Sequence, residues 1–538
     1  MAELPTILDH HFDSAFSQFQ IDREIVRNLL KEKRHLLKKE KSSFLNENIA
    51  EAGGKKSLFN IVDSFLLKKP GLKLPRHDSL PDLVSRFSDH FLKKVTDIRA
   101  SLDDVASCSS ATATADADVS SDVPSSSSFL FSSFERVSVC DIAALIKECP
   151  SKSSSRDPIP TSLLKKFAHV LAVPIASIVN LSLSSGILPG EMKLAFVSPL
   201  LKKPSLCVDD LNNYRPVSLL SFLSKLVERV VAEQLSSHLL AGDLYVSVQS
   251  AYRPNHSTET ALLKVFNDLL LSVDSGDAAV LALLDQSAAF DTIDHSILLS
   301  RLTCRFGITG SVLTWFRSYL YDRCQSVSIS GVNSAAVYLS FGVPQGSVLG
   351  PVLFTLYNSP IHSISLKHGV TDHYYADDDQ KYVSFHLTPD YFEQRRAFST
   401  LSACVGETKQ WMAENRIKFN DSKSDAIVVY SKTSRCKPAD FPLAIGDASI
   451  TPSDSVRNLG ITIDKHLTMY LQIYKTCRSA LFHLRRIARI RKFLSRSAAV
   501  QLVSAFISFP FHPIVPYSYF QRSVLYPELL HLPPSVFF

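Results

Sequence analysis

The segment AAVLALL, residues 278–284, ends directly at Asp285 and constrains the fold of this chain more than any other feature. A short, unbroken apolar run after a Gly-Asp turn is typical of a strand buried on both faces. A second segment, HYYADDDQKYVSF at 373–385, predicts a strand, an acidic turn and another strand, because Val383 and Phe385 recur with the period of a half-buried strand. The chain must therefore contain a sheet whose strands end in carboxylates.

The acidic residues define a possible site. If the two strands are neighbours, Asp285 and the triplet Asp377-Asp378-Asp379 converge, and converging carboxylates repel unless a cation lies between them. Such oxygen ligands suit Mg²⁺ or Mn²⁺. Two ions about 4 Å apart would stabilise the attacking and leaving oxygens of a phosphoryl transfer. Asp is also common in turns, which explains the triplet alone equally well, but this alternative does not explain Asp285.

Two other segments fit the same chemistry. VSPLLKKP and NNYRPVSLL place Lys202, Lys203 and Arg215 near turns, and these side chains are suited to a triphosphate. The glycines of FGVPQGSVLGP, residues 341–351, let the backbone approach a ligand closely. Taken alone, this last segment is equally consistent with an ordinary loop and helix start.

Charge is informative through its distribution. The net charge is +6, which by itself does not indicate nucleic-acid binding. The stretch 474–496 carries eight basic residues and no acidic one, and the stretch 31–41 is rich in lysine. Such clusters attract phosphates, although a solvated helix face is the alternative for either cluster alone.

Nothing in the sequence indicates secretion or a membrane. The N-terminus lacks the pattern of a signal peptide, and no run of about 18 apolar residues suggests a transmembrane helix. The nine cysteines show no zinc-like spacing. We expect an intracellular protein, nuclear or cytoplasmic, without a membrane partner.

Composition divides the chain into five parts. Residues 1–100 read as a charged, helical connector, and 101–134 as a disordered linker rich in Ser and Ala. Dense apolar segments follow over 135–472, and the basic stretch lies in 473–509. The tail 510–538 is rich in proline, so we expect it to be irregular.

Several motifs together resemble the reverse transcriptases of non-LTR (LINE-type) retrotransposons. LALLDQSAAFDTIDH and YYADDDQKYVSF resemble the two catalytic motifs of that family. SRDPIPTSLLKK resembles the segment that opens the family's polymerase domain. NNYRPVSLLSFLSKLVERVV, QSAYRPNHSTETAL and GVPQGSVLGPVLFTLY resemble its fingers and intervening motifs. RIKFNDSKSDAIVV and VRNLGITID resemble its later palm motifs. They occur in family order from about Ser155 to Asp464, which makes the combined resemblance highly specific.

The resemblance implies an α+β right-hand polymerase, with fingers, a palm built on an antiparallel sheet, and a partial thumb over 473–509. The catalytic carboxylates and ligands of two Mg²⁺ or Mn²⁺ ions would be Asp285, Asp377 and Asp378. Lys423 would be the general acid that protonates the leaving pyrophosphate. The partners would be an RNA template, a DNA primer and dNTPs.

The resemblance also assigns binding residues. Lys202 and Arg215 would hold the incoming triphosphate, Gln345 would line the nucleotide pocket, and Phe290 would be the steric gate against a ribose 2′-hydroxyl. The nucleic-acid-binding residues would be Leu459 and Gly460 at the primer end and Arg485, Arg486 and Arg489 in the thumb.

The sequence departs from the family at several places. Gln286 replaces an apolar residue, LYNSPI at 356–361 replaces a more polar continuation, and Asp379 replaces Thr or Ser. We expect Asp379 to add a third negative charge beside the metals and near the entering triphosphate. The thumb pattern ends after about Ser508, and we expect no endonuclease, ribonuclease H or zinc knuckle.

The expected function is RNA-templated DNA synthesis by two-metal catalysis. One alternative is a decayed retrotransposon remnant that is inactive or merely binds nucleic acid, which the departures favour. Another is an RNA-dependent RNA polymerase, which also uses paired aspartates, but Phe290 as a gate argues against it.

Overall fold

The structure, a computed structural model, describes residues 4–66, 74–109, 129–150, 157, 159–287, 289–445 and 448–508. The chain divides into two compact units. The larger unit is Lys73–Met469, and the smaller unit joins Met1–Leu72 to Tyr470–Phe538.

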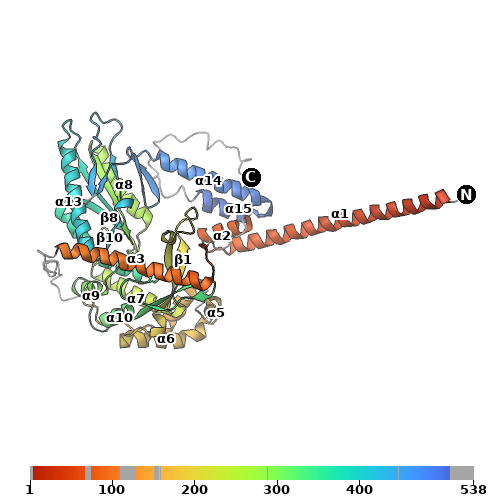
Figure 1. Ribbon diagram of the computed structural model, residues 1–538, viewed down its shortest axis with the longest axis horizontal. Coiled ribbons are helices and arrows are strands. Elements are labelled where there is room, and N and C mark those ends of the chain that lie inside the picture. The colour runs from red at the N-terminus through yellow and green to blue at the C-terminus, as the bar shows by residue number, and fades with distance from the viewer. Residues whose placement is uncertain are drawn as a thin grey trace. The chain divides into compact units, whose positions relative to one another are not determined.

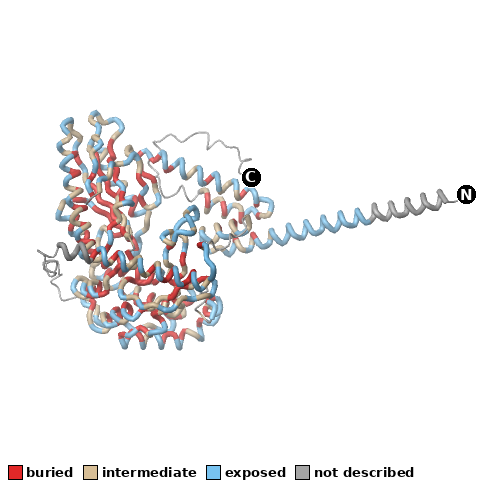
Figure 2. Tube along the Cα trace, in the orientation of Figure 1, coloured by how far each residue is buried: buried red, intermediate tan, exposed pale blue. Residues whose placement is uncertain are grey.

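The centre of the larger unit is an antiparallel four-stranded sheet in the order β11-β3-β9-β8 (Figure 1). Its strands are β3 (Ala278–Leu284), β8 (Thr371–Tyr375), β9 (Asp378–Phe385) and β11 (Asp425–Val429). We call it the palm sheet. Strand β3, the apolar run of the sequence, lies between two other strands and is buried almost throughout, as Figure 2 shows for the sheet.

The two faces of the palm sheet belong to different cores, which explains why β3 is apolar at every position. Ala279 and Leu281 face a small cluster that includes Val265 and Leu269 of α8 (Thr258–Asp274). The alternate residues of β3 face the main core, to which α13 (Phe392–Glu414) also contributes. Ser257 caps the N-terminus of helix α8, because its hydroxyl accepts a hydrogen bond from Thr260 N–H in a capping box.

A second sheet, the fingers sheet, has the order β2-β1-β5-β6, and β7 also pairs with β5. The strands are β1 (Leu194–Leu201), β2 (Tyr214–Leu219), β5 (Arg323–Ile329), β6 (Val332–Asn333) and β7 (Val337–Leu339). Helix α3 (Leu80–Ser109) covers this sheet, with Phe87 and Phe91 packed among Val197, Tyr214 and Val327.

Helix α3 corrects the expected start of the linker, because it continues through residues 101–109. At the other end of the linker, the N–H of Phe131 donates to the carbonyl of Gly307, and the ring of Phe134 lies edge-on to Trp315. These residues therefore belong to the folded unit. The part of the expected linker at 110–128 lies outside the described residues.

The rest of the main core is helical, and its helices are α4 (Val139–Glu148), α5 (Thr161–Lys166), α6 (Ala168–Ser185), α7 (Phe222–Ala241), α9 (His295–Cys304), α10 (Gly310–Leu320), α11 (Gly350–Asn358) and α12 (Ile361–His368). Three further strand pairs complete the unit: β4 (Gln286–Ser287) with β10 (Lys418–Phe419), β12 (Leu443–Ile445) with β13 (Ala448–Ile450), and β14 (Ser455–Asn458) with β15 (Ile461–Asp464). Among the described helices, α6 alone is long and apolar enough to cross a membrane by length and composition. Its buried residues belong to the main core, which is typical of a core helix in a globular protein.

The smaller unit brings the two ends of the chain together in a helical core. It contains α1 (Leu4–Ala50), α2 (Lys55–Leu66), α14 (Tyr470–Ile490) and α15 (Arg496–Val503). Leu45 and Val62 pack with Ile487 and Leu502, and the rings of Phe59 and Phe506 stack at 4.1 Å. The helical connector and the partial thumb, expected as separate parts, thus share one core. The expected irregular tail at 510–538 lies outside the described residues.

Candidate active site

The register of the palm sheet brings the acidic residues together. Leu284 of β3 is opposite Asp379 of β9, and Tyr375 of β8 is opposite Asp378. Asp285 is the first residue after β3, so an antiparallel register places it opposite Asp378. Directly opposed residues in such a pair have Cα atoms roughly 4.5–5.5 Å apart. Asp377 lies in the adjoining two-residue turn between β8 and β9.

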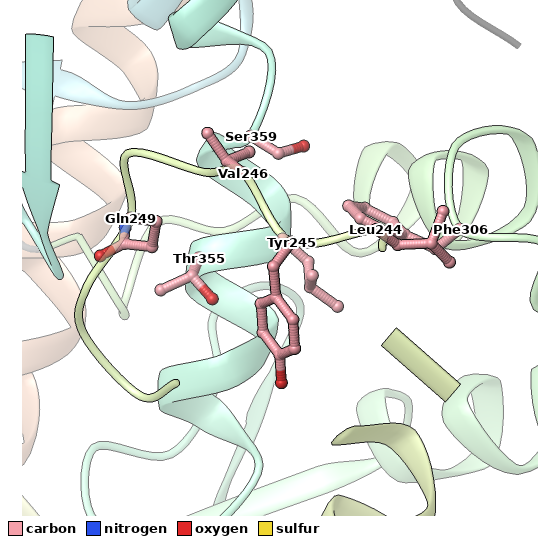
Figure 3. A pocket seen from close by; sticks show the side chains of 8 residues that line it. Leu244, Tyr245, Val246, Gln249, Phe306, Thr355 and Ser359 are labelled. Atoms are coloured by element: carbon pink, nitrogen blue, oxygen red, sulfur yellow. The ribbon is translucent and has the colours of Figure 1, made fainter. Parts of the chain in front are cut away.

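The turn that carries Asp377 is held by a residue that the sequence analysis did not single out. Ala376 has φ +59°, a left-handed conformation that costs a residue with a Cβ roughly 1–2 kcal/mol. The side-chain oxygen of buried Gln249 accepts hydrogen bonds from the N–H of Ala376 at 3.3 Å and of Ala251 at 2.9 Å. Gln249 is the first residue of the QSAYRPNHSTETAL motif, and this position was the feature of the sequence from which its role could have been suspected. A cavity of about 10 Å³ beside Gln249 is too small for a substrate (Figure 3).

Asp285 has two hydrogen-bond donors close to its carboxylate. The ammonium of Lys423 donates to Asp285 Oδ2 at 3.0 Å, and the side chain of Asn420 donates to the same atom at 2.8 Å. Lys423 remains 68% exposed. The structure therefore brings the expected general acid to the expected catalytic carboxylate, and it adds Asn420, which the sequence analysis did not select.

The carboxylates influence one another electrostatically. Partial desolvation of its carboxyl, followed by the charges on Asp377 and Asp285, raises the pKa of Asp378 to about 6, although the residue remains exposed to solvent. Burial also raises the pKa of Asp377, with a further contribution from Asp285. This repulsion is what a divalent cation would relieve, so the chemistry of the donor set fits a metal. Among the residues that the structure describes, however, no three acidic, His or Cys side chains converge tightly enough to enclose an ion.

Asp379 does not add charge beside the carboxylate site, which corrects the expectation from the sequence. Its side chain is 1% exposed and forms an ion pair at 3.4 Å with Lys381, which is fully buried. The reason is the alternation of strand β9, because successive side chains point to opposite faces. Asp378 is exposed, whereas Asp379 is directed into the protein.

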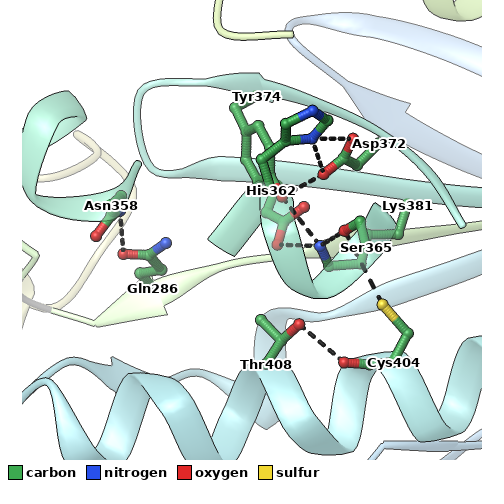
Figure 4. Close-up of polar contacts among 10 residues, drawn as sticks. Gln286, Asn358, His362, Ser365, Asp372, Tyr374, Lys381, Cys404 and Thr408 are labelled. Atoms are coloured by element: carbon green, nitrogen blue, oxygen red, sulfur yellow. Dashed lines mark hydrogen bonds and ion pairs between the residues drawn. The ribbon is translucent and has the colours of Figure 1, made fainter. Parts of the chain in front are cut away.

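A buried polar network surrounds Lys381 (Figure 4). Its ammonium donates to the hydroxyls of Ser365 at 2.7 Å and Tyr374 at 3.1 Å. The Tyr374 hydroxyl donates to Asp372 at 2.5 Å, and Asp372 lies 2.9 Å from the Nδ1 atom of His362. The charge of Lys381 is thus matched by neighbouring acids and hydroxyls instead of being isolated.

A second departure from the family is also compensated. Gln286 is buried next to Asp285, and its side-chain oxygen accepts a hydrogen bond from Asn358 at 3.2 Å (Figure 4). Asn358 belongs to LYNSPI, the other altered segment. The two substituted residues are therefore joined by one hydrogen bond, while Asn358 Oδ1 is buried without a partner among the described residues.

The residues expected to hold the triphosphate lie on one hairpin. Arg215 is opposite Leu200 in the pairing of β1 and β2, and Lys202 follows the end of β1. Both side chains are exposed, and the ammonium of Lys202 donates to the carbonyl of Asn212 at 2.8 Å. Partial desolvation of the ammonium, and then the charges of Lys94 and Lys423, lower the pKa of Lys202. The hairpin and Lys423 are thus within electrostatic reach of each other.

Phe290 and Gln345 lie on two adjoining loops. The Phe290 ring packs against Phe354 at 5.0 Å, and its carbonyl accepts a hydrogen bond from Val343 N–H at 2.8 Å. The carbonyl of Gln345 accepts from Ser218 N–H at 2.8 Å, which joins this loop to strand β2. The side-chain oxygen of Gln345 is buried without a hydrogen-bond partner among the described residues.

The expected primer-end residues form the turn of the β14–β15 hairpin. Leu459 has φ +44° and Gly460 has φ +92°, as a two-residue hairpin turn requires. The hairpin is joined to β9 by a buried hydrogen bond of 2.7 Å from Asn458 to Gln380.

The expected thumb residues belong to α14 of the smaller unit. Arg485 and Arg489 are exposed. Arg486 forms an ion pair with Asp63 of α2, and its side chain is only 14% exposed. Arg486 is therefore part of the helical core of this unit, unlike its two neighbours.

Known proteins resemble this chain over the region that carries the site. The reverse transcriptase (RNA-dependent DNA polymerase) family matches residues 201–463. The probable RNA-directed DNA polymerase from transposon BS of Drosophila melanogaster is 27% identical over 372 residues, or 68% of this chain and 40% of that protein. The RNA-directed DNA polymerase from mobile element jockey of the same species is 26% identical over 341 residues, or 62% of this chain and 36% of that protein. The chain thus spans less than half of these curated relatives.

A solved structure shows a distant likeness. Apo telomerase from Candida tropicalis superposes with a TM-score of 0.37 at 12% identity, covering 64% of this chain and 63% of that one. This likeness is too distant to bear on the site.

An antiparallel sheet with carboxylates at a strand end and in the adjoining turn is the palm of a right-hand polymerase. Residues 201–463 of this chain match the reverse transcriptase family, and the relatives named here are RNA-directed DNA polymerases of Drosophila mobile elements, which supports a reverse transcriptase of the non-LTR, LINE type. As a family, these enzymes depend on divalent metal ions and act on a nucleic-acid template, a primer and nucleotides.

Proposed function

We propose that this chain is an RNA-directed DNA polymerase that extends a DNA primer on an RNA template with dNTPs. The observation that carries the proposal is the register of the palm sheet, which pairs Leu284 with Asp379 and Tyr375 with Asp378. This register supports a site in which Asp285, the next residue after β3, lies near Asp377 and Asp378. We expect it to act inside the cell, in the nucleus or cytoplasm.

In this mechanism, Asp285, Asp377 and Asp378 would hold two Mg²⁺ or Mn²⁺ ions, which supply Lewis-acid stabilisation of the phosphoryl transfer. Lys202 and Arg215 bind the triphosphate through charge-assisted hydrogen bonds. Lys423 donates a proton to the leaving pyrophosphate. Lys423 contacts Asp285, and its side chain is 68% exposed, which supports a position beside the carboxylates and open to a substrate.

Nucleotide choice follows from the two loops beside the carboxylates. Phe290 excludes the ribose 2′-hydroxyl, and its contact with Phe354 limits how far the ring can move aside. Gln345 offers a buried, unpartnered amide oxygen to the nucleotide. Leu459 and Gly460 would grip the primer end, and Arg485 and Arg489 would contact duplex phosphates.

The alternative, an inactive remnant, has less support than the sequence alone gives it. A decaying sequence accumulates unpaired buried polar groups. Here Gln286 accepts a hydrogen bond from Asn358 and the charge of Asp379 is countered by Lys381, although the Asp379 oxygens and Asn358 Oδ1 have no hydrogen-bond partner among the described residues. Both substitutions near the carboxylates are therefore compatible with an ordered site.

Primer extension with the purified full chain tests the proposal. We expect incorporation of dNTPs on an RNA template with Mg²⁺ or Mn²⁺. Incorporation of rNTPs in preference to dNTPs would instead support an RNA polymerase. Template binding without any extension by the folded protein would support the inactive remnant.

A further inference from the structure

The second half of helix α3 contacts both loops that carry the proposed nucleotide-selecting residues. The guanidinium of Arg99 forms an ion pair with Asp294, with Nη2 2.8 Å from Oδ2, and both side chains are largely buried. Its Nη1 donates to the carbonyl of Thr292 at 3.4 Å. The same guanidinium lies over the ring of Phe341, with Cζ 5.0 Å from the ring centroid.

These contacts bridge two loops that are joined directly to each other. The N–H of Gly342 donates to Ile293 O at 2.8 Å, and the N–H of Val343 donates to Phe290 O at the same distance. A Cβ on Gly342 would lie only 2.7 Å from Asp291 O, so the backbones are in close contact. The position of Phe290 relative to Gln345 therefore depends on how these two loops are held together.

The first half of α3 is fixed to the sheet on the triphosphate side. The ring of Phe87 lies edge-on to Tyr214, with centroids 5.0 Å apart. Tyr214 directly precedes Arg215 on β2, and Leu83 and Val84 pack in the same cluster. One continuous helix thus contacts the strands that present the triphosphate-binding residues and the loops that present the sugar-selecting residues.

We propose that Arg99 is a positioning residue that sets the spacing between Phe290 and Gln345. Helix α3 thereby fixes the position of the nucleotide pocket relative to the fingers sheet. This inference rests on the proposed function. Arg99 lies outside residues 201–463, the region that matches the family. It touches neither the carboxylates nor the expected triphosphate ligands, so it acts through the two loops.

The chemistry of arginine suits this role. A planar guanidinium can form a directed ion pair at its edge while its face stacks on an aromatic ring, whereas an ammonium cannot do both. Lysine at position 99 would therefore retain the attraction to Asp294 and lose the contact with Phe341. This difference separates the positioning role from simple charge neutralisation.

The test compares Arg99→Leu and Arg99→Lys with Arg86→Ala, a change at an exposed arginine on the same helix. In single-nucleotide incorporation on an RNA template, we expect Arg99→Leu to raise the KM for dNTP and reduce dNTP-over-rNTP discrimination by about tenfold. The affinity for primer–template should stay unchanged. Arg99→Lys should give an intermediate effect and Arg86→Ala none.

A purely structural role would give a different result. If Arg99→Leu lowers the melting temperature while KM and sugar discrimination stay at the wild-type values, the inference is overturned. If the wild-type chain proves inactive, the proposed function fails, but hydrogen exchange still tests the role of Arg99. Arg99→Leu should then speed amide exchange selectively at 290–295 and 341–346, and unchanged exchange there would overturn it.

Discussion

Asp379 and Lys381 form an ion pair of 3.4 Å in which neither side chain is accessible to solvent beyond 1%. Burial raises the pKa of Asp379 to about 6, although Lys381 opposes the shift. The pair lies directly behind the carboxylate of Asp378, on the opposite face of strand β9. The residue that most departs from the family near the site is therefore part of the interior.

This pair predicts strongly coupled mutations. Asp379→Thr, which restores the residue usual in the family, should destabilise the protein by roughly 3–5 kcal/mol, because it leaves Lys381 buried without its partner. Lys381→Met alone should also destabilise. The double variant should recover most of the loss in a denaturant-unfolding cycle. Additive effects of the two single changes would show that the pair is not coupled.

Phe290 predicts a change of substrate. Phe290→Val should admit ribonucleotides by opening space for the 2′-hydroxyl, and Phe290→Ala should do so more strongly. The Ala variant should also lose roughly 3 kcal/mol or more of stability, since the ring packs on Phe354. Competition between dNTP and rNTP incorporation measures the effect. Reduced stability with unchanged discrimination would mean that Phe290 is only a core residue.

Two buried histidines predict a loss of stability in acid. Burial lowers the pKa of His295 and of His373 below the ordinary value of 6.5. At these two positions the unfolded chain binds more protons than the folded one, so their contribution to stability falls as pH drops below about 6.5, whereas the raised pKa values of Asp378 and Asp379 act in the opposite direction. His295→Gln should flatten this dependence, because glutamine does not titrate. Its amide can still donate a hydrogen bond to Gly342 O, so the local structure should be kept. Unfolding measured between pH 5 and 8 tests this, and an unchanged slope would contradict it.

The thumb arginines predict distinct effects on binding and stability. Arg485→Ala and Arg489→Ala should weaken duplex binding and reduce the slope of log affinity against log salt by about 1 each. Arg486→Ala should mainly destabilise the fold, because Arg486 pairs with Asp63. With so few phosphate contacts, we expect distributive synthesis. Processive synthesis of long cDNA at physiological salt would contradict this expectation.

The central strands could be predicted because their signals are local. An apolar run ending at Asp285 is sufficient to indicate β3, and the structure places that strand at Ala278–Leu284. The acidic turn between two strands was likewise predicted and is confirmed by the pairing of β8 with β9.

The face of the sheet on which Asp379 lies could have been predicted from the sequence, but our expectation for this residue was wrong. Strand alternation already requires Asp378 and Asp379 to face opposite sides, and Lys381, two residues on, shares the face of Asp379. The expectation of added charge beside the metals came from adjacency in the sequence. Adjacency in a strand is a poor guide to which face a side chain occupies.

Long-range pairings could not be predicted from one sequence. The contact between Gln286 and Asn358 depends on how α11 packs beside β4, and the ion pair of Arg486 with Asp63 joins opposite ends of the chain. Neither contact has a local pattern. The same is true of Gln249, whose role depends on a turn that lies far from it in the sequence.

The most direct test of the account is single-turnover incorporation of one dNTP on an RNA template by wild-type protein, Asp285→Asn and Asp277→Asn. Asp277 precedes the opposite end of the same strand, where it pairs with His386, so it is a matched control. We predict that Asp285→Asn abolishes incorporation while its melting temperature and primer–template affinity stay near wild type, and that Asp277→Asn remains active. Equal activity of the two variants would contradict catalysis by the palm carboxylates.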